Sequence, residues 1–237
     1  MRRHIPFAAF ALLLAFAAVP ARATCNYEYA KGEYGIIRHG LSPDKRLSLS
    51  SHGEGELGDV NFHVWLMAEP DHRKVIALDE IGVDNNLDSC PDAYHAVWSA
   101  DSRHAAIAFR SSRHEVELNL YSIEQLRAHP IGGPSLFREV TSRDVGEQDH
   151  LNQSLSTIEW RRGNRFVLRE YRTFIVSDPG FVRMFGAYGR VTEKLDDGRL
   201  EVEFSAEADC LLLPGHRYRA VDLRPARPGA PDWWYSQ

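Results

Sequence analysis

Oxygen-bearing side chains are concentrated in one polar segment of the chain, Asp84-Asn85-Asn86-Leu87-Asp88. Carboxylate and amide oxygens at short spacing are the ligands that calcium prefers, so Asp84, Asn86 and Asp88 are candidate calcium ligands. The segment lacks the glycine and the distant glutamate of a helix–loop–helix calcium site, and side-chain bonding within a turn explains the same residues. We therefore predict that the protein holds no cofactor or metal, with calcium as the alternative.

A second acidic segment, residues 51–59, combines glycines with the acids Glu54, Glu56 and Asp59. The glycines predict a loop. Its acids would repel phosphate, so a phosphate-binding role is excluded. Paired carboxylates can serve as general acid and base or hold a catalytic metal, and Glu54 and Glu56 together with Asp84 and Asp88 would supply them. A hydrolase or metal-dependent enzyme that uses these loop carboxylates is therefore the alternative function.

Other catalytic patterns are not found in the sequence. No histidines are spaced as His-x-His or His-Glu-x-x-His, which leaves His95 and His104, on either side of one predicted turn, as the zinc alternative. The chain has no Gly-x-Ser-x-Gly elbow and no phosphate-binding Gly-Lys-Ser/Thr loop. We predict no catalytic residues, and a role in binding.

The candidate acidic and amide residues of segments 51–59 and 84–88 lie on loops between short predicted strands. Apolar and polar residues alternate in segments such as 115–121, the period of a half-buried strand. Residues 166–176 are rich in β-branched and aromatic residues, which also favours a strand. The segment Ser122–Ala128 predicts one helical turn with Ser122 as its N-cap. The predicted fold class is mostly β, built from antiparallel hairpins.

One hairpin pattern occurs three times. The residues that coincide when the copies are aligned without gaps are Leu41, Trp98 and Trp160, then Asp44, Asp101 and Gly163, and then Arg46, Arg103 and Arg165. An apolar run follows each turn. A hairpin that cannot bury its apolar side alone stacks on its copies, so we predict that Leu41, Trp98 and Trp160 share one core. Three unrelated hairpins with similar turns are the alternative.

The segments Leu-Ser-Pro-Asp-Lys-Arg at 41–46 and Trp-Ser-Ala-Asp-Ser-Arg at 98–103 resemble the repeat of TolB-type and dipeptidyl-peptidase-type β-propellers. In those repeats an aromatic residue, Ser-Pro-Asp-Gly/Ser and an apolar strand join two strands of each blade. The resemblance covers about half of the chain that remains after residues 1–23. The hydrolase domain that accompanies the propeller in the peptidases has no counterpart in this sequence. The resemblance implies a small or incomplete propeller, because closed propellers usually have four to eight blades, and binding through the loops of one face.

Three cysteines, Cys25, Cys90 and Cys210, predict one disulfide and one remaining thiol in an oxidising compartment. Cys25 and Cys90 each precede a strand of the turn repeat and could occupy equivalent loops, so we favour this pair, while the other pairings stay open. A catalytic cysteine would need a histidine and an orienting Asn or Asp nearby. The sequence contains no local signature of that kind.

The N-terminus has the features of a secretory signal: Arg2 and Arg3, an apolar run from Phe7 to Val19, and Ala21-Arg22-Ala23. The run is shorter than the ~20 residues that span a bilayer. We predict a cleaved signal peptide over 1–23, an uncleaved anchor being the alternative. One β-rich domain is expected over 24–223, followed by a Pro- and Arg-rich tail over 224–237 that ends in Trp233-Trp234-Tyr235.

The formal net charge is −5 and the chain has no long basic block, which argues against a nucleic-acid partner. No later segment is apolar enough for stable membrane insertion. We predict an exported, soluble β-repeat protein, periplasmic or secreted, that binds an unidentified protein or small molecule through loops 53–59 and 82–91. A third hypothesis is an envelope partner that docks on the aromatic tail. We favour instead that the tail packs on its own domain.

Overall fold

The structure is a computed structural model that describes residues 24–226. Within this range thirteen strands form one mixed sheet, whose outermost strands in the pairing order, β4 and β11, do not meet. The prediction of a mostly β fold is confirmed, whereas a propeller is not shown. The predicted signal peptide and the aromatic end of the tail lie outside the described residues.

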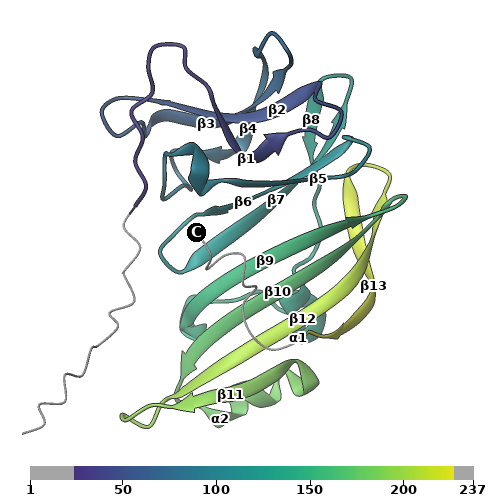
Figure 1. The fold of residues 1–237 in the computed structure, drawn as a ribbon. Helices are drawn as coiled ribbons and strands as arrows, with labels where there is room; N and C mark the ends of the chain where they lie inside the picture. Colours follow the sequence, from purple (N-terminus) through teal and green to yellow (C-terminus); the bar gives the residue numbers. More distant parts are fainter. Residues whose placement is uncertain (1–23, 227–237) are drawn as a thin grey trace, which may run out of the picture.

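The strands form three successive antiparallel units, seen from top to bottom in Figure 1. The first unit contains β1 (Gly35–Leu41), β2 (Leu47–Glu54), β3 (Val60–Ala68) and β4 (Arg73–Gly82). The second contains β5 (His95–Trp98), β6 (His104–Arg110), β7 (Glu115–Glu124) and β8 (Arg127–Pro130). The third contains β9 (Leu151–Arg161), β10 (Arg165–Val176), β11 (Gly189–Lys194), β12 (Leu200–Leu213) and β13 (Arg217–Pro225). Two parallel pairings, β1 with β5 and β7 with β9, join the units.

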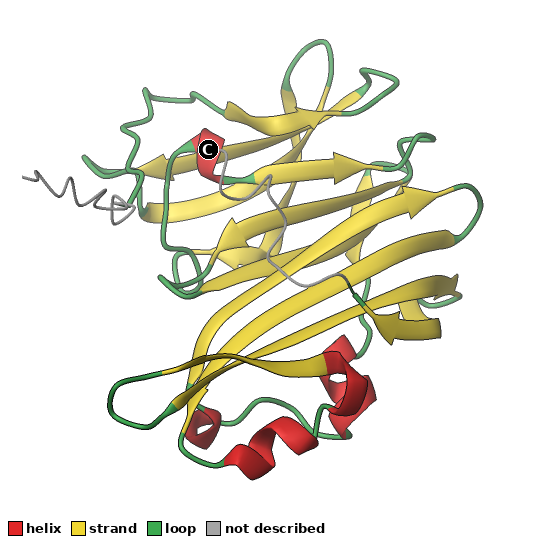
Figure 2. Cartoon of the chain, turned by 60° about the horizontal axis from the view of Figure 1, so that its bottom comes forward, coloured by secondary structure: helices red, strands yellow, loops and turns green. Residues whose placement is uncertain are grey.

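The helices are short, and both α-helices lie beside the third unit (Figure 2). They are α1 (Leu136–Thr141) and α2 (Pro179–Arg183), with the 3-10 turns η1 (Pro91–Ala93), η2 (Glu147–Asp149) and η3 (Gly186–Tyr188). The buried Glu170 carboxylate on β10 accepts a hydrogen bond from the Leu136 N–H at 2.7 Å, which holds α1 against the sheet. None of the helices within residues 24–226 has the length and apolar character needed to cross a membrane.

The second unit is buried on both faces. On β6, Ile107 and Phe109 belong to the hydrophobic core shared with the first unit, whereas Ala106 belongs to the core shared with the third unit and α1. Side chains alternate across a strand, so burial on both faces requires apolar residues at successive positions. This explains the unbroken apolar run in this strand.

The prediction that the repeated position contributes to one shared core is wrong. Leu41 is 42% exposed, Trp98 packs against the core of the first two units, and Trp160 packs against the core of the third. The second unit lies between the two cores and separates them. The three turns nevertheless occupy equivalent places, because each joins the first two strands of its unit.

The repeated tryptophans link each unit to the one before it. The Trp98 indole N–H donates to the Gly40 carbonyl at 3.1 Å, and the Trp160 indole N–H donates to the Val97 carbonyl at 2.8 Å. Gly40 and Val97 are themselves equivalent, since each immediately precedes the aligned position of its unit. The sequence alignment therefore identifies residues that make the same contact.

The first two turns also share their internal bonding. The Ser42 hydroxyl donates to the Asp44 carboxylate at 2.8 Å, and the Ser99 hydroxyl donates to the Asp101 carboxylate at 2.7 Å. The Asp44 N–H in turn donates to the Ser102 hydroxyl at 3.2 Å, so the two turns touch. The resemblance in the Ser-x-Asp sequence thus corresponds to one turn structure used twice.

We expect Trp98→Phe and Trp160→Phe each to lower the free energy of unfolding by about 1–2 kcal/mol, because each leaves a backbone carbonyl without its indole donor. Equilibrium urea denaturation measures the change. Trp65→Phe is the matched control, since the buried Trp65 indole N–H has no hydrogen-bond partner among the described residues. An equal loss in the control would show that ring packing, rather than the indole bond, is responsible.

Candidate functional site: the loop cleft beside the disulfide

Cys25 and Cys90 form a disulfide, with their Cα atoms 5.5 Å apart, which confirms the favoured pair. The N–H groups of Ser89 and Cys90 donate to the Cys25 carbonyl at 2.9 and 3.1 Å, so backbone bonds reinforce the covalent link. Cys210 is a buried thiol, and burial raises its pKa to about 12. It therefore carries little thiolate at neutral pH, as is typical of a structural cysteine.

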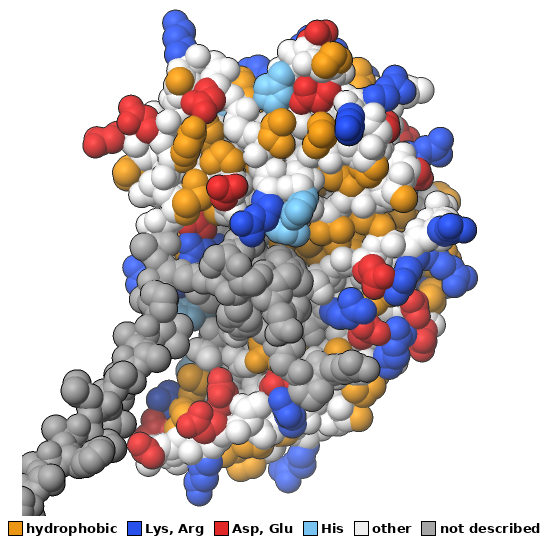
Figure 3. Space-filling view, viewed as in Figure 1, with side chains coloured by type: hydrophobic (Ala, Val, Ile, Leu, Met, Phe, Trp, Pro, Cys, Tyr) orange, Lys and Arg blue, Asp and Glu red, His pale blue; other side chains and the backbone are white. Residues whose placement is uncertain are grey.

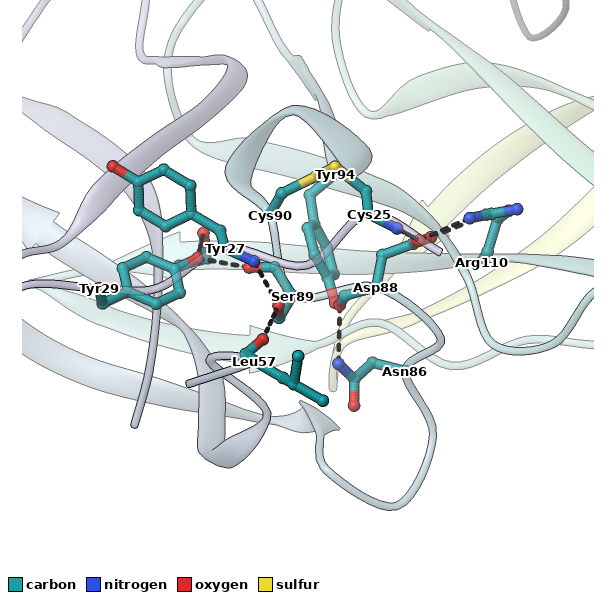
Figure 4. The surroundings of a disulfide bond; sticks show 11 residues. Cys25, Tyr27, Tyr29, Leu57, Asn86, Asp88, Ser89, Cys90, Tyr94 and Arg110 are labelled. Atoms are coloured by element: carbon teal, nitrogen blue, oxygen red, sulfur yellow. Dashed lines mark hydrogen bonds and ion pairs between the residues drawn. A yellow bond between two sulfur atoms is a disulfide. The ribbon is translucent and has the colours of Figure 1, made fainter. Parts of the chain in front are cut away.

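Ser89, next to the disulfide, holds three segments together (Figure 4). Its hydroxyl donates to the Leu57 carbonyl and accepts from the Tyr27 N–H at 3.0 Å. Its carbonyl accepts from the Tyr29 hydroxyl at 2.6 Å, and burial raises the pKa of that phenol. The chain before β1, the β2–β3 loop and the loop after β4 are thus fixed relative to one another.

Asp88 forms a buried ion pair with Arg110 from β6 (Figure 4). The Arg110 guanidinium donates to both carboxylate oxygens, Nε to Oδ2 at 2.7 Å and Nη2 to Oδ1 at 2.5 Å. The Cys25 N–H donates to Oδ1 at 2.7 Å. The Asp88 side chain is only 2% exposed, so this two-point geometry neutralises a charge that burial alone would destabilise.

The two loops that the sequence singled out for binding meet at a cleft of about 510 Å³. The residues that line it are Asn26, Asp59, Val60, Asn61, Val83, Asn86, Leu87, Asp88 and Ser89. Three apolar side chains, Leu57 and Val83 on these loops and Val60 at the start of β3, are about half exposed, at 48%, 50% and 52%. Figure 3 shows hydrophobic side chains among charged ones over the first unit, at the top of the view. The loops therefore combine a polar cleft with exposed apolar groups.

Amides and one exposed carboxylate give the cleft its chemistry. The Asn61 amide donates to the Glu54 carboxylate at 3.1 Å, and the Asn86 amide donates to the Asp88 carbonyl at 2.8 Å. With these nitrogens engaged, each side chain retains its carbonyl oxygen as an acceptor. Together with the exposed Asp59 carboxylate, the cleft is rich in acceptors and suits a ligand that donates hydrogen bonds.

The candidate calcium ligands have separate roles in the structure. Asp88 is paired with Arg110, Asn86 bonds the backbone of its own loop, and Asp84 is exposed. Across residues 24–226, no group of three or more His, Cys, Asp or Glu side chains is placed to hold a metal ion. Glu54 and Glu56 are likewise exposed. Among the four candidate carboxylates only Asp88 is buried, and its charge is neutralised by Arg110.

His95 and His104 are too far apart to share a zinc ion. His95 lies opposite Ala108 in the β5–β6 pairing, and His104 lies four residues from Ala108 along β6. At the rise of an antiparallel strand this separates the two residues by about 14 Å. The ring centroid of His95 is instead 4.9 Å from that of His39.

His95 gives a prediction for stability against pH. Burial lowers its pKa to about 4. Between about pH 6.5 and 4 the unfolded chain binds a proton at this histidine while the folded chain does not, so the stability that His95 contributes falls as the pH falls. We expect His95→Asn to flatten the stability profile between pH 7 and 5, measured by urea denaturation. An unchanged slope in the variant would contradict the assignment.

A second groove, of about 550 Å³, was not predicted from the sequence. It lies between the β5–β6 and β7–β8 turns and the β12–β13 turn, and it is lined by Arg103, His104, Ser122, Ile123, Glu124, Gln125, Asn164, Leu212, Leu213, Pro214, Gly215 and His216. Near it the rings of His129 and His216 stack at 4.4 Å. These residues come from segments far apart in the chain. The sequence marked Arg103 by its repeated position, His104 as part of the zinc alternative and Ser122 as an N-cap, but nothing in it placed them around one groove.

Comparison of the chain with protein-family models, with curated proteins and with solved structures finds no match.

Proposed function

We propose that this protein is an exported binding protein whose ligand site is the cleft between loops 53–59 and 82–91. The observation that carries the proposal is that two loops separated by strands β3 and β4 meet at a cleft whose base is held by a disulfide, hydrogen bonds and an ion pair. The disulfide, Ser89 and the Asp88–Arg110 pair form that base. Binding residues are commonly held on loops by a rigid scaffold.

Export is supported by the signal-like N-terminus and by the disulfide, because disulfides persist in oxidising compartments such as the periplasm and the extracellular space. The finer architecture that we propose is an incomplete propeller-like array of three hairpin units. Its support is the shared Ser-x-Asp turn and the indole bonds of Trp98 and Trp160, which repeat from one unit to the next.

The ligand class that we propose is a small molecule rich in hydroxyl or amino groups. Its hydrogen-bond donors would meet the acceptors of Asp59, Asn61 and Asn86, while an apolar part would pack on Val60 and Val83. A nucleic acid fits poorly with a formal net charge of −5.

The test begins with the mature protein isolated from the culture medium or periplasm, where N-terminal sequencing is expected to start at Thr24. Thermal unfolding with a panel of saccharides, polyamines and amino acids then searches for a ligand that raises the melting temperature. We expect Asp59→Ala to lower the affinity at least tenfold and Asp196→Ala, an exposed carboxylate on the β11–β12 turn, to leave it unchanged. Equal affinities of the two variants, or no ligand in the panel, would overturn the proposal.

The alternative, a hydrolase or metal-dependent enzyme that uses loop carboxylates, makes a different prediction. It requires a stoichiometric metal in the purified protein that is lost in Asp84→Ala, or hydrolysis that Glu54→Gln abolishes. The buried pairing of Asp88 with Arg110 favours the binding function, because it removes one of the carboxylates that such an enzyme would use.

A further inference from the structure

A small apolar groove lies where the second and third units diverge, away from the loop cleft. It measures about 220 Å³ and is lined by His95, Val97, Ala108, Leu118, Thr157 and Ile158. Four strands, β5, β6, β7 and β9, contribute to it. Its size and lining suit one aromatic side chain, whose ring would contact aliphatic groups and whose polar edge would meet the Thr157 hydroxyl.

The groove continues onto one face of the third unit, here called the open face and defined by the register partners Leu155, Tyr171 and Ser205. Ala108 lines the groove and also packs with Leu155 in a small separate cluster. Thr157, two residues after Leu155 on β9, lies on the same face and lines the groove as well. The groove and the open face are therefore one continuous surface.

Several side chains on the open face are buried as deeply as those of a core, although Tyr171 is only partly buried. Thr173 and Glu203 are each 4% exposed and Ser205 is 7% exposed. The α-helices do not account for this burial. The Leu136 and Phe137 side chains of α1 pack in the core on the opposite side of these strands. Asn152 and Arg190 contact Thr173 and Glu203 from the side, and a further segment lying on the open face would account for the rest of this burial.

We propose that residues 227–237 of this same chain cross the open face and place one indole of Trp233-Trp234 in the groove. The described chain ends beside this face, since the Ala226 N–H donates to the Ser205 carbonyl on β12 at 3.2 Å. From Ser205 the register leads across β10 to Leu155 on β9, about 10 Å away, and Thr157 is about 7 Å further along that strand. An extended segment of this length reaches roughly 36 Å.

The sequence of the segment matches this path. Pro228 and Pro231 favour an extended backbone and reduce the conformational entropy lost on docking. The aromatic side chains follow only after these prolines, at a distance from Ala226 that the path requires. The docked segment would cover the groove, so the groove would be closed to outside ligands, while the loop cleft on the first unit would stay accessible.

The test uses the full mature chain, whose five tryptophans are replaced by 5-fluorotryptophan. Trp233→Phe and Trp234→Phe assign the two tail signals in ¹⁹F NMR. We expect at least one of the two tail signals to have a chemical shift well away from that of free 5-fluorotryptophan. Leu118→Arg, which places a charge in the groove, is expected to return it to that position. The control Ile76→Arg, at a 39% exposed site of the first unit, should leave it in place.

The signals of Trp65, Trp98 and Trp160 report whether each variant is folded. A second measurement does not depend on Leu118→Arg. In saturation-transfer NMR, free indole is expected to bind the Trp233→Ala/Trp234→Ala variant but not the wild-type chain. Tail signals at the free position in the wild type, or equal indole binding by both proteins, would overturn the proposal. The proposal would also be overturned if the shifted tail signal disappeared when a dimer was diluted to monomers, because the groove would then hold the tail of a second copy.

Discussion

Replacing both Cys25 and Cys90 by alanine is expected to lower the free energy of unfolding by about 4 kcal/mol. The disulfide links positions 65 residues apart, and in the chain-entropy account a cross-link of this span restricts the unfolded chain by roughly that amount. Equilibrium urea denaturation of the mature protein measures the change. Reduction of the wild type should produce the same loss, because it removes the same bond.

Two controls accompany this prediction. Adding reductant to the Cys25→Ala/Cys90→Ala variant should change nothing further. Cys210→Ala should cost about 1 kcal/mol through the small cavity it leaves, and its stability should still fall on reduction. A double variant as stable as the wild type would mean that Ser89 and Asp88 hold the loops without the disulfide.

Arg110→Met is expected to cost about 3–5 kcal/mol, because it leaves the buried Asp88 carboxylate without its counter-charge. The loss should be measured by the same denaturation. Since Asp88 is part of the base of the cleft, affinity for any cleft ligand should fall with it. The surface pair of Arg138 and Asp144, whose side chains are 58% and 68% exposed, supplies the comparison.

For that exposed pair, Arg138→Met should change the stability by no more than about 1 kcal/mol. The double variant Asp88→Asn/Arg110→Met should be less destabilised than Arg110→Met alone, since it buries no unpaired charge. Similar losses for Arg110→Met and Arg138→Met would show that the Asp88–Arg110 pair does not stabilise the fold.

Local features of the sequence predicted much of the fold because they depend on neighbouring residues. The Ser-x-Asp turns fix their own hydrogen bonds, and the alternation around Leu118 reports a strand with unlike faces. The Cys25–Cys90 pair followed from the position of each cysteine before a repeat. The two binding loops were located by composition, and the structure places residues of both around one cleft.

Features that depend on distant contacts could not be predicted in this way. Ser122–Ala128, expected as a helical turn, instead continues β7 to Glu124 and returns in β8, with Gln125 and Leu126 at positive φ. Neither residue favours that conformation, so the turn has no local signal, and the pairing of the two strands determines it. The pairing of Asp88 with Arg110 likewise becomes visible only once β6 lies beside the loop.

The double-sided burial of β6 has a consequence for cooperativity. A fragment that lacked either neighbouring unit would expose one apolar face of the middle strands to water, so no piece of the array would be expected to persist by itself. Melting should then occur as one event, and limited proteolysis should yield either intact protein or small peptides. In this respect the three units are expected to form a single cooperative folding unit, unlike domains that unfold independently.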